Sequence, residues 1–279
     1  MAGLKYLLLG LVAGLALGVV VSRSADALLA GVKSECLISS GKFAQPPKPG
    51  EKPSVIVGLD AQYPPFTQML PNGSIVGFDV DVMKRVGEAC GFEPMFKAWD
   101  WSTIINALVS GDVDVIASGM TVTAARSEKV WFSIPYYAYN HYLVVRAGIG
   151  GSAEELLKKG LKVAVQTGST ADMLAEKLKQ EGYPITKLGY ESYPAALKAV
   201  LEGVADAGIF DSAFLEPYLR QYPETATGIR IVSSIGPVKT YAIATRPGDK
   251  WLRDCINREL EKLMETPEWE ALLRKWGLG

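Results

Sequence analysis

The sequence predicts an α/β protein with two lobes, each a parallel or mixed sheet flanked by helices, and two crossing hinge strands that join the lobes. Short apolar strands alternate with helices, the same order of elements occurs twice, and two further apolar strands lie outside the copies. Strands that alternate with helices favour a parallel sheet covered on both faces. The chain of 279 residues, 48% of them hydrophobic, is long enough to form two cores.

The two copies share one plan. The first has strands over 55–59, 93–97 and 113–117 and helices over 79–90 and 102–109. The second has strands over 162–166, 185–189 and 205–210 and helices over 170–180 and 193–201. In each copy a helix ends at a glycine and an aspartate follows three residues later, namely Gly111 with Asp114 and Gly203 with Asp206. Two related lobes explain these sequences better than one sheet does.

The remaining elements determine the order in which the chain visits the lobes. Apolar strands over 141–146 and 240–246 follow the two copies, and a short remainder with two helical segments comes last. The remainder is too short for a third lobe, so we expect it to pack on the first. Lobe one is then 54–143 with 241–279, and lobe two is 144–240. A paired crossing of this kind can act as a hinge.

The N-terminus has the pattern of an export sequence. An apolar run over 7–21 follows Lys5, and Ala25-Asp26-Ala27 offers a cleavage site, so 1–27 is expected to be a signal peptide or an uncleaved anchor. Residues 28–53, which end in a proline-rich stretch, are interpreted as a flexible linker. Together they place the remainder of the chain outside the cytoplasm, in the periplasm or at the cell surface.

The cysteines give little sign of a metal site. Cys36, Cys90 and Cys255 are odd in number and have no CxxC spacing, so at most one disulfide can form. The charged residues before Cys36 do not fit a lipid-attachment sequence, which leaves Cys36 as a free thiol. Cys90 with Cys255 is the pair to test for a disulfide, although the favoured interpretation is that both are buried in helices as small hydrophobic residues.

Polar residues follow the strands at their carboxyl ends, where open parallel sheets bind ligands. These residues are Asp60, Tyr63, Ser118, Gly119, Thr121 and Arg126 in the first copy, and Ser169, Thr170 and Asp211 in the second.

The chemistry of this set matches a zwitterion. Arg126 can hold a carboxylate bidentately, and the backbone N–H groups near Ser169 and Thr170 add donors at a helix N-terminus. Asp211 would then take an ammonium group. Each residue has an ordinary alternative, since Arg126 can be a solvated helix charge, Thr170 an N-cap and Asp211 a helix cap. Their joint placement at strand ends favours the site.

Aromatic side chains are expected to form the walls. Tyr63 precedes two prolines, and Trp101 lies in a loop between a strand and a helix, so both can place rigid apolar area against a ligand side chain. Trp99 is assigned to the core.

At these residues the sequence resembles the polar amino acid-binding proteins of ABC importers, the family-3 extracellular solute-binding proteins, which have the type 2 periplasmic binding protein fold. The resemblance runs from about Ser54 to Gly279. It rests on Asp-x-x-Tyr-Pro-Pro-Phe at 60–66, Gly-Phe-Asp-Val-Asp-Val at 77–82, Ser-Gly-Met-Thr-Val-Thr-x-x-Arg at 118–126, Phe-Ser-x-Pro-Tyr-Tyr at 132–137 and Gln-x-Gly-Ser-Thr at 166–170.

The resemblance implies a role for each site residue. Arg126 and the backbone around Thr121 and Thr170 would bind the α-carboxylate, and Ser118 or Gly119 would share the α-ammonium with Asp211. Tyr63 and Trp101 would flank the ligand side chain. Gln166 adds no charge there, so Asp60 suggests a basic or amide side chain, that of arginine, lysine, histidine or glutamine. Asp60 can instead orient a local hydrogen-bond network.

Other functions fit less well. A net charge of −1 gives no reason to expect a nucleic acid partner. The sequence has no GxSxG, HExxH or P-loop motif, and its only histidine, His141, is assigned a structural role. The glycine-rich 148–153 is interpreted as a turn between the lobes, with Ser152 and Glu155 as a capping box. We therefore expect a monomeric binder with no cofactor and no metal, whose partner is an ABC permease. A cyclohexadienyl dehydratase-like enzyme and an amino-acid-sensing receptor domain are the alternatives.

Overall fold

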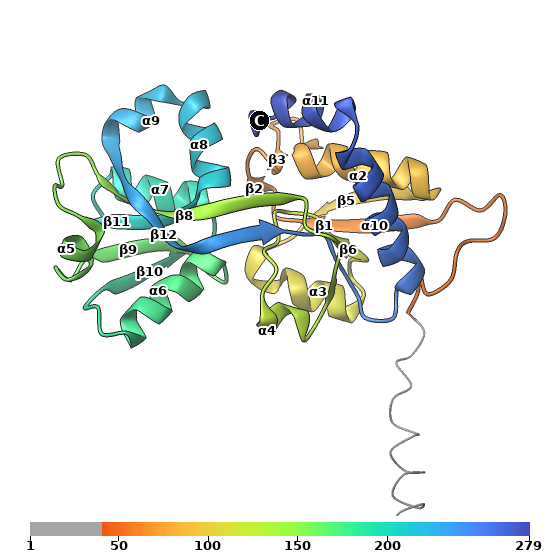
Figure 1. The fold of residues 1–279 in the computed structure, drawn as a ribbon, viewed down its shortest axis with the longest axis horizontal. Helices are drawn as coiled ribbons and strands as arrows, with labels where there is room; N and C mark the ends of the chain where they lie inside the picture. Colours follow the sequence, from red (N-terminus) through yellow and green to blue (C-terminus); the bar gives the residue numbers. More distant parts are fainter. Residues whose placement is uncertain (1–40) are drawn as a thin grey trace, which may run out of the picture. The chain divides into compact units, whose positions relative to one another are not determined.

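The computed structural model describes residues 41–279, which form one compact unit. The predicted signal peptide or anchor, residues 28–40 of the predicted linker and Cys36 lie outside the described residues. The described part contains two five-stranded sheets with helices on their faces, so the predicted two-lobed α/β class is confirmed (Figure 1). We call the part built on the first sheet lobe one and the part built on the second lobe two.

The sheet of lobe one contains parallel and antiparallel strands. Its strand order is β5 (Glu93–Ala98), β1 (Ser54–Leu59), β6 (Val115–Ile116), β13 (Ala244–Thr245), β7 (Trp131–Phe132). Strand β1 runs parallel to β5 and β6, whereas β13 is antiparallel to its neighbours. A small sheet comprises β2 (Gln62–Tyr63), β3 (Thr67–Met69) and β4 (Ile75–Val76). The helices are α2 (Phe78–Cys90), the 3-10 helix η1 (Trp101–Thr103), α3 (Ile104–Ser110), α4 (Ala124–Ser127), α10 (Lys250–Met264) and α11 (Pro267–Lys275).

Lobe two repeats the plan with a second mixed sheet. Its strand order is β10 (Thr186–Tyr190), β9 (Lys162–Gln166), β11 (Ala207–Asp211), β8 (Tyr137–Arg146), β12 (Ile229–Tyr241). Its helices are α5 (Ala153–Leu157), α6 (Thr170–Gln180), α7 (Tyr193–Leu201), α8 (Ser212–Gln221) and α9 (Pro223–Gly228). All residues of β11 are buried, as expected for a central strand that is covered on both faces. The predicted capping box, Ser152 with Glu155, opens α5.

The glycine and aspartate shared by the copies perform the same task in both lobes. Gly111 and Gly203 follow helices with φ of 91° and 76°, a conformation that favours glycine. Asp114 then accepts the backbone N–H of Ile56 at 3.0 Å, and Asp206 accepts that of Lys162 at 2.9 Å. In each lobe the aspartate therefore fastens the entrance of the third strand of the copy to the first.

Strands β8 and β12 connect the lobes as a long antiparallel pair (Figure 1). The predicted bounds of the second crossing strand, 240–246, are wrong. The crossing is made mostly by β12, which lies earlier in the chain, and residues 244–245 form β13 in the sheet of lobe one. The reason lies in the sequence of β12. Two irregularities, between Ile231 and Ser233 and between Ile235 and Lys239, interrupt the alternation that would have revealed the strand.

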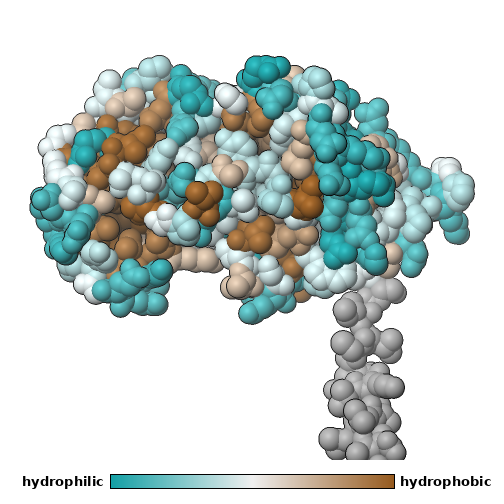
Figure 2. Space-filling model, viewed as in Figure 1, coloured by the Kyte–Doolittle hydropathy of each residue, from teal (hydrophilic) through white to brown (hydrophobic). Residues whose placement is uncertain are grey.

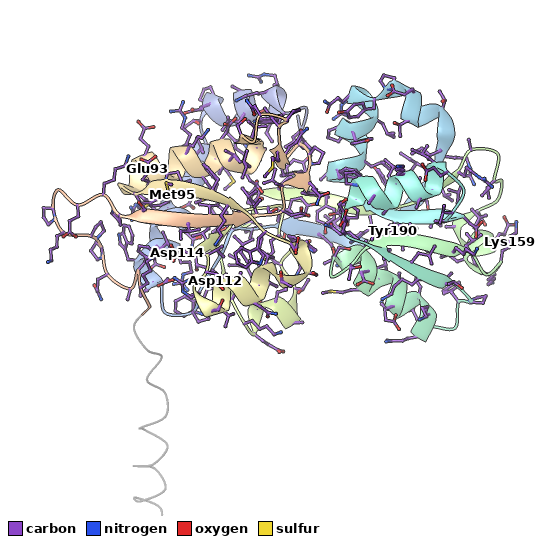
Figure 3. All side chains as sticks on the ribbon, turned by 180° about the vertical axis from the view of Figure 1, so that it is seen from behind. Glu93, Met95, Asp112, Asp114, Lys159 and Tyr190 are labelled. Carbon is purple, nitrogen blue, oxygen red and sulfur yellow. A yellow bond between two sulfur atoms is a disulfide. The ribbon has the colours of Figure 1, made fainter. Side chains whose placement is uncertain are left out.

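The carboxyl ends of the parallel strands in the two lobes face each other. In lobe two, Lys159 precedes β9 at the far end of the lobe, while Tyr190, the last residue of β10, lies at the end toward lobe one (Figure 3). In lobe one, Glu93 begins β5 at the outer end (Figure 3). Loops that follow the strands of both lobes therefore meet between them, as the sequence predicts.

Residues 41–43 are packed against lobe one. Phe43 is 6% exposed, contacts the ring of Trp251 and donates its backbone N–H to Asp249 at 2.7 Å. Lys42 pairs with the buried Asp114 at 2.9 Å. This part of the predicted 28–53 linker is therefore not a flexible tether. The ring of Phe43, its backbone N–H and the ammonium of Lys42 all have partners on lobe one.

Cys90 and Cys255 form a disulfide between α2 and α10. The favoured interpretation of two separate buried thiols is therefore wrong, although the pair chosen for testing is the one that forms. The helical context was predicted correctly. What the sequence could not show is that α10 packs against α2 and brings the two Cα atoms within 6.0 Å.

The surface is unevenly polar. Hydrophilic residues gather over α10, whereas hydrophobic residues are visible over lobe two (Figure 2). Among residues 41–279, no helix combines the length and the apolar character needed to cross a bilayer.

Candidate functional site

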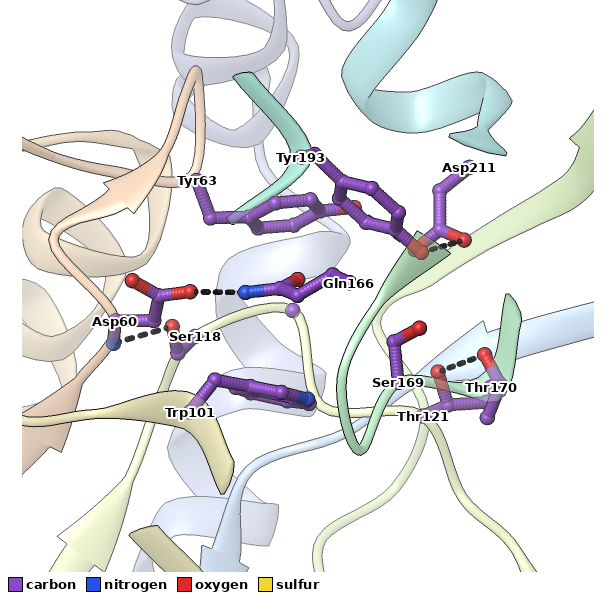
Figure 4. A pocket seen from close by; sticks show the side chains of 11 residues that line it. Asp60, Tyr63, Trp101, Ser118, Thr121, Gln166, Ser169, Thr170, Tyr193 and Asp211 are labelled. Atoms are coloured by element: carbon purple, nitrogen blue, oxygen red, sulfur yellow. Dashed lines mark hydrogen bonds between the residues drawn. The ribbon is translucent and has the colours of Figure 1, made fainter. Parts of the chain in front are cut away.

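A small cavity lies between the lobes where the strand-end loops meet (Figure 4). Ten of the eleven predicted site residues line it, together with Tyr193, which was not predicted. The lining residues are Asp60, Tyr63, Trp101, Ser118, Gly119, Thr121, Gln166, Ser169, Thr170, Tyr193 and Asp211. Its volume of ≈ 10 Å³ is about that needed for one water molecule.

Arg126, the eleventh predicted residue, lies beside the cavity, behind Thr121. Its Nη1 donates to the carbonyl of Thr121 at 2.9 Å, and its Nη2 donates to the carbonyl of Gly168 in lobe two at 3.1 Å. The guanidinium also lies over the ring of Trp101, 5.2 Å from the centroid. Arg126 is only 4% exposed, which excludes the alternative of a solvated helix charge. Burial lowers the pKa of this guanidinium from its usual value.

Two carbonyls occupy only part of the donor capacity of Arg126. A guanidinium carries five N–H donors in a fixed fork, and the two contacts above use two of them. The remaining N–H groups can still donate to a carboxylate in the bidentate geometry that suits this side chain.

The loop from Ser118 to Thr121 is held by a carboxyl group beneath it. Asp79, at the start of α2, accepts the backbone N–H of Gly119 at 2.7 Å and the hydroxyl of Tyr136 at 2.8 Å. Burial raises the pKa of Asp79 to about 7. Gly119 has a φ of 56°, and a Cβ there would lie 2.6 Å from the Tyr63 ring, so the loop requires glycine. The Gly-Phe-Asp motif therefore supports the site without lining it.

In lobe two the cavity is lined at the N-terminus of α6. Ser169 caps this helix by accepting the N–H of Asp172, so the alternative that Thr170 is merely the N-cap is wrong. The Thr170 hydroxyl instead points to polar neighbours, with Tyr139 Oη at 2.9 Å and Thr121 Oγ1 at 3.5 Å.

Asp211, the last residue of β11, is surrounded by tyrosine hydroxyls. Its Oδ2 accepts from Tyr63 at 3.0 Å and from Tyr241 at 2.7 Å, and its Oδ1 accepts from Tyr193 at 2.8 Å. Although it occupies the N-cap position of α8, its side chain makes no capping hydrogen bond. The capping alternative is therefore wrong, and the carboxylate faces the cavity.

Asp60 lies at the other end of the cavity, on the lobe-one side. Its carboxyl group accepts the backbone N–H of Gln62 at 3.1 Å and the side-chain amide of Gln166, from lobe two, at 2.7 Å (Figure 4). Burial raises the pKa of Asp60 to about 6, an effect that the Gln166 amide opposes and that the nearby carboxylates of Asp100 and Glu191 reinforce. This end of the site is therefore acidic.

The predicted aromatic walls are in place. Tyr63 and Trp101 lie on opposite sides of the cavity, with the Gln166 amide between them (Figure 4). Trp99, assigned to the core, is only partly buried. It packs against a hydrophobic cluster that includes Ile104, Leu108 and Ile116, and it does not line the cavity.

Of the tyrosines near Asp211, the sequence analysis identified Tyr63 and missed Tyr193, Tyr241 and Tyr139. Tyr193 begins α7 in the loop region that follows β10, so the strand-end rule could have identified it had the rule been applied to every strand of lobe two. Tyr241 and Tyr139 lie in the crossing strands, and only the pairing of β8 with β12 shows that they reach the site. Within residues 41–279, no three histidine, cysteine or acidic side chains are grouped to hold a metal ion.

Comparisons with known proteins identify the family of this chain. Residues 55–279 match the model of the bacterial extracellular solute-binding proteins, family 3. A probable histidine-binding protein of Neisseria gonorrhoeae is 32% identical over 85% of this chain and 87% of its own length.

Solved structures give the same result. An ancestral arginine-binding protein bound to arginine superposes with a TM-score of 0.74 at 33% identity, covering 81% of this chain and 98% of its own. An ancestral amino acid-binding protein described as a precursor of cyclohexadienyl dehydratase gives 0.71 at 31% identity, covering 80% and 95%. The chain belongs to the bacterial extracellular solute-binding proteins, family 3.

Proposed function

We propose that this chain captures a basic amino acid outside the cytoplasm and delivers it to an ABC importer by hinge closure, with no chemistry of its own. The observation that carries the proposal is the distribution of charge around one cavity. Arg126 lies beside it, Asp211 lies on its lobe-two side, and Asp60 forms its acidic lobe-one end. This arrangement complements a zwitterion with a cationic side chain.

The α-carboxylate is assigned to Arg126 and the polar groups next to it. The guanidinium retains free donors, and the hydroxyls of Thr121 and Thr170 lie on the same side of the site, at the N-terminus of α6. The α-ammonium is assigned to Asp211, where it would replace tyrosine hydroxyls as the donor. Ser118 and Gly119 complete this end of the pocket.

The ligand side chain would extend between Tyr63 and Trp101 toward Asp60. In the structure the Gln166 amide donates to the Asp60 carboxyl group, so the guanidinium or ammonium of the ligand would replace this amide as the donor. The carboxylates of Asp100 and Glu191 add negative charge at the same end. A cation is therefore preferred over a neutral amide at this position.

Hinge closure is supported by the contacts between the lobes. Tyr63 reaches Asp211, Gln166 reaches Asp60 and Arg126 reaches Gly168, each from one lobe to the other. The cavity of ≈ 10 Å³ is much smaller than an amino acid, so the lobes must separate before a ligand can enter. A ligand that bridges both lobes then favours the closed form.

The remaining features of the function are proposals on the same basis. Membership of an extracellular family supports export by the N-terminal segment, and the disulfide is typical of an oxidising compartment. Lobe boundaries at 54–143 with 241–279 and 144–240 agree with β8 and β12 as the connecting strands. We propose a monomer whose partner is the permease and which binds no nucleic acid.

A calorimetric titration of the protein with each of the twenty amino acids tests the proposal. Arginine, lysine or histidine should bind with the highest affinity, and the bound ligand should be recovered unchanged by mass spectrometry. Conversion of the ligand would contradict a role without chemistry and would favour an enzyme. No heat with any amino acid would refute the proposal.

Replacing Asp60 with asparagine tests the side-chain assignment. The loss of the carboxylate should weaken binding of a basic amino acid about tenfold or more, because a charge-assisted contact is removed, and should change glutamine binding much less. Calorimetry with arginine and glutamine measures both effects. Equal losses for the two ligands would contradict a cationic side chain at Asp60.

Acidification should release a basic ligand. A bound cation favours the ionised form of Asp60, so affinity is highest above the pKa of this group and falls as the pH decreases through about 6. Between pH 7.5 and 5.0 the affinity for arginine should fall about tenfold, since only about a tenth of the carboxyl groups stay ionised one unit below their pKa. The Asp60→Asn variant is the control and should lose this part of the pH dependence.

A further inference from the structure

His141 is a buried polar group whose role the proposed function leaves open. It lies in β8, is fully buried, and stands opposite Asp211 in the register of β8 with β11. Its Nε2 lies 3.1 Å from Thr170 Oγ1 and 3.3 Å from Asp211 Oδ1. Thr170 and Asp211 are the groups assigned above to opposite ends of a zwitterion, so one ring nitrogen touches both.

The contacts determine which nitrogen of His141 carries the proton. The hydrogen-bond partner of Nε2 is Thr170 Oγ1, and the carboxylate oxygen Oδ1 of Asp211 lies 3.3 Å from the same nitrogen. A carboxylate oxygen would repel an unprotonated Nε2 with its lone pair, so the contact favours a hydrogen on Nε2. The other nitrogen, Nδ1, is buried and has no hydrogen-bond partner among residues 41–279, which disfavours a second proton there. The ring is therefore a neutral imidazole with its proton on Nε2.

This tautomer has a consequence for Thr170. When the Nε2 proton faces the Thr170 oxygen, that oxygen accepts, and the hydroxyl keeps its own hydrogen for another partner. The N–H also places partial positive charge near Oδ1 of Asp211 and leaves the ring without a net charge. An imidazolium would instead pair with Asp211 and compete with a ligand cation.

We propose that His141 is a positioning residue that orients Thr170 as a donor to the ligand carboxylate and keeps Asp211 available as an acceptor for the ligand ammonium. The inference rests on the proposed function, in which Thr170 helps to bind the ligand carboxylate and Asp211 binds the ligand ammonium. His141 contacts both of these groups. The chain contains one histidine, so no other imidazole can substitute for it.

The surroundings favour the neutral ring. Three elements present polar or charged groups to His141, with Asp211 from β11, Thr170 from α6 and Lys239 from β12, while Tyr139 packs edge-on from β8 itself. Burial lowers the pKa of His141, Lys239 lowers it further, and the opposing effect of Asp211 does not outweigh burial.

The first test observes the ring directly. In the untagged wild-type protein, the single histidine gives one pair of imidazole nitrogen signals in NMR, and these report the tautomer. We expect the neutral Nε2–H form from pH 8 down to below the ordinary value of 6.5. A proton on Nδ1, or titration at the ordinary value, would overturn the proposal.

The second test compares two variants. His141→Gln can place an amide N–H near the position of Nε2, whereas His141→Leu removes the donor. Calorimetry with arginine should show near wild-type affinity for the glutamine variant and a loss of about ten- to a hundredfold for the leucine variant. An equal loss in both, or no loss in the leucine variant, would overturn the proposal.

Truncated ligands separate positioning from general structural damage. Agmatine lacks the carboxylate and 5-guanidinopentanoate lacks the ammonium, so the penalty of His141→Leu should be smaller with each than with arginine. A penalty that is the same for all three ligands would contradict the proposed role. The matched control is Tyr142→Phe, which should bind normally. Tyr142 lies next to His141 on β8, and the substitution removes only its hydroxyl, which donates to Glu216 of α8. If the wild type binds no basic amino acid, the proposed function itself fails, and the NMR result still decides the tautomer.

Discussion

Replacing Arg126 with alanine is expected to abolish measurable amino acid binding. The substitution removes the guanidinium from the end of the site proposed for the carboxylate, so the ligand carboxylate would be desolvated without its proposed partner. Truncation of one member of a buried charged pair costs about 2–5 kcal/mol, which corresponds to a loss of roughly 30-fold to several thousand-fold. Calorimetry with arginine measures the loss.

Arg253 is a matched control for this variant. Its guanidinium also lies over a tryptophan ring, 4.5 Å from the centroid of Trp131, but it lies outside the cavity. Arg253→Ala should therefore bind normally. Arg126→Lys should be intermediate, because an ammonium keeps the charge and loses the bidentate geometry. Unchanged affinity in Arg126→Ala would remove the carboxylate assignment.

Loss of the disulfide should cause the largest change in stability. Cys90 and Cys255 are 165 residues apart in sequence, so the bond restricts a very long loop of the unfolded chain. The loop-entropy model gives about 5 kcal/mol for such a loop. The Cys90→Ala, Cys255→Ala double variant should unfold at a markedly lower denaturant concentration, and ligand affinity should stay unchanged, because both residues lie away from the cavity.

Reduction provides an independent comparison for the double variant. Adding a reductant to the wild type should lower its denaturation midpoint toward that of the double variant, while the variant itself should not respond. Denaturation curves that coincide with and without the bond would show that α2 and α10 are held by packing alone.

The fold was predictable because its signals are local. Alternation of short apolar strands with helices, repeated with the same Gly111–Asp114 and Gly203–Asp206 spacing, is visible within a few tens of residues. Strand β12 was not predictable in this way. Its irregularities and the positive φ of Gly236 disrupt the period of two, and only its pairing with β8 defines the strand.

The gathering of the candidate residues around one cavity was predictable for a related reason. A parallel sheet places the carboxyl ends of its strands at one edge, so residues such as Asp60, Ser118 and Asp211 could be assigned together without knowledge of their distances. The residues that hold these side chains and loops in place could not be predicted in the same way. That Asp79 holds Gly119, or that Tyr241 bonds to Asp211, depends on contacts between segments 40 and 30 residues apart, and no local pattern encodes those contacts.

The disulfide also changes the topology of the chain. Lobe two is inserted between two separate stretches that build lobe one, and the bond from Cys90 to Cys255 closes a covalent ring around the whole insertion. A protease that cuts a loop of lobe two would therefore leave two fragments that migrate as one molecule until they are reduced. New chain ends could be placed in such a loop while both parts of lobe one stayed covalently joined.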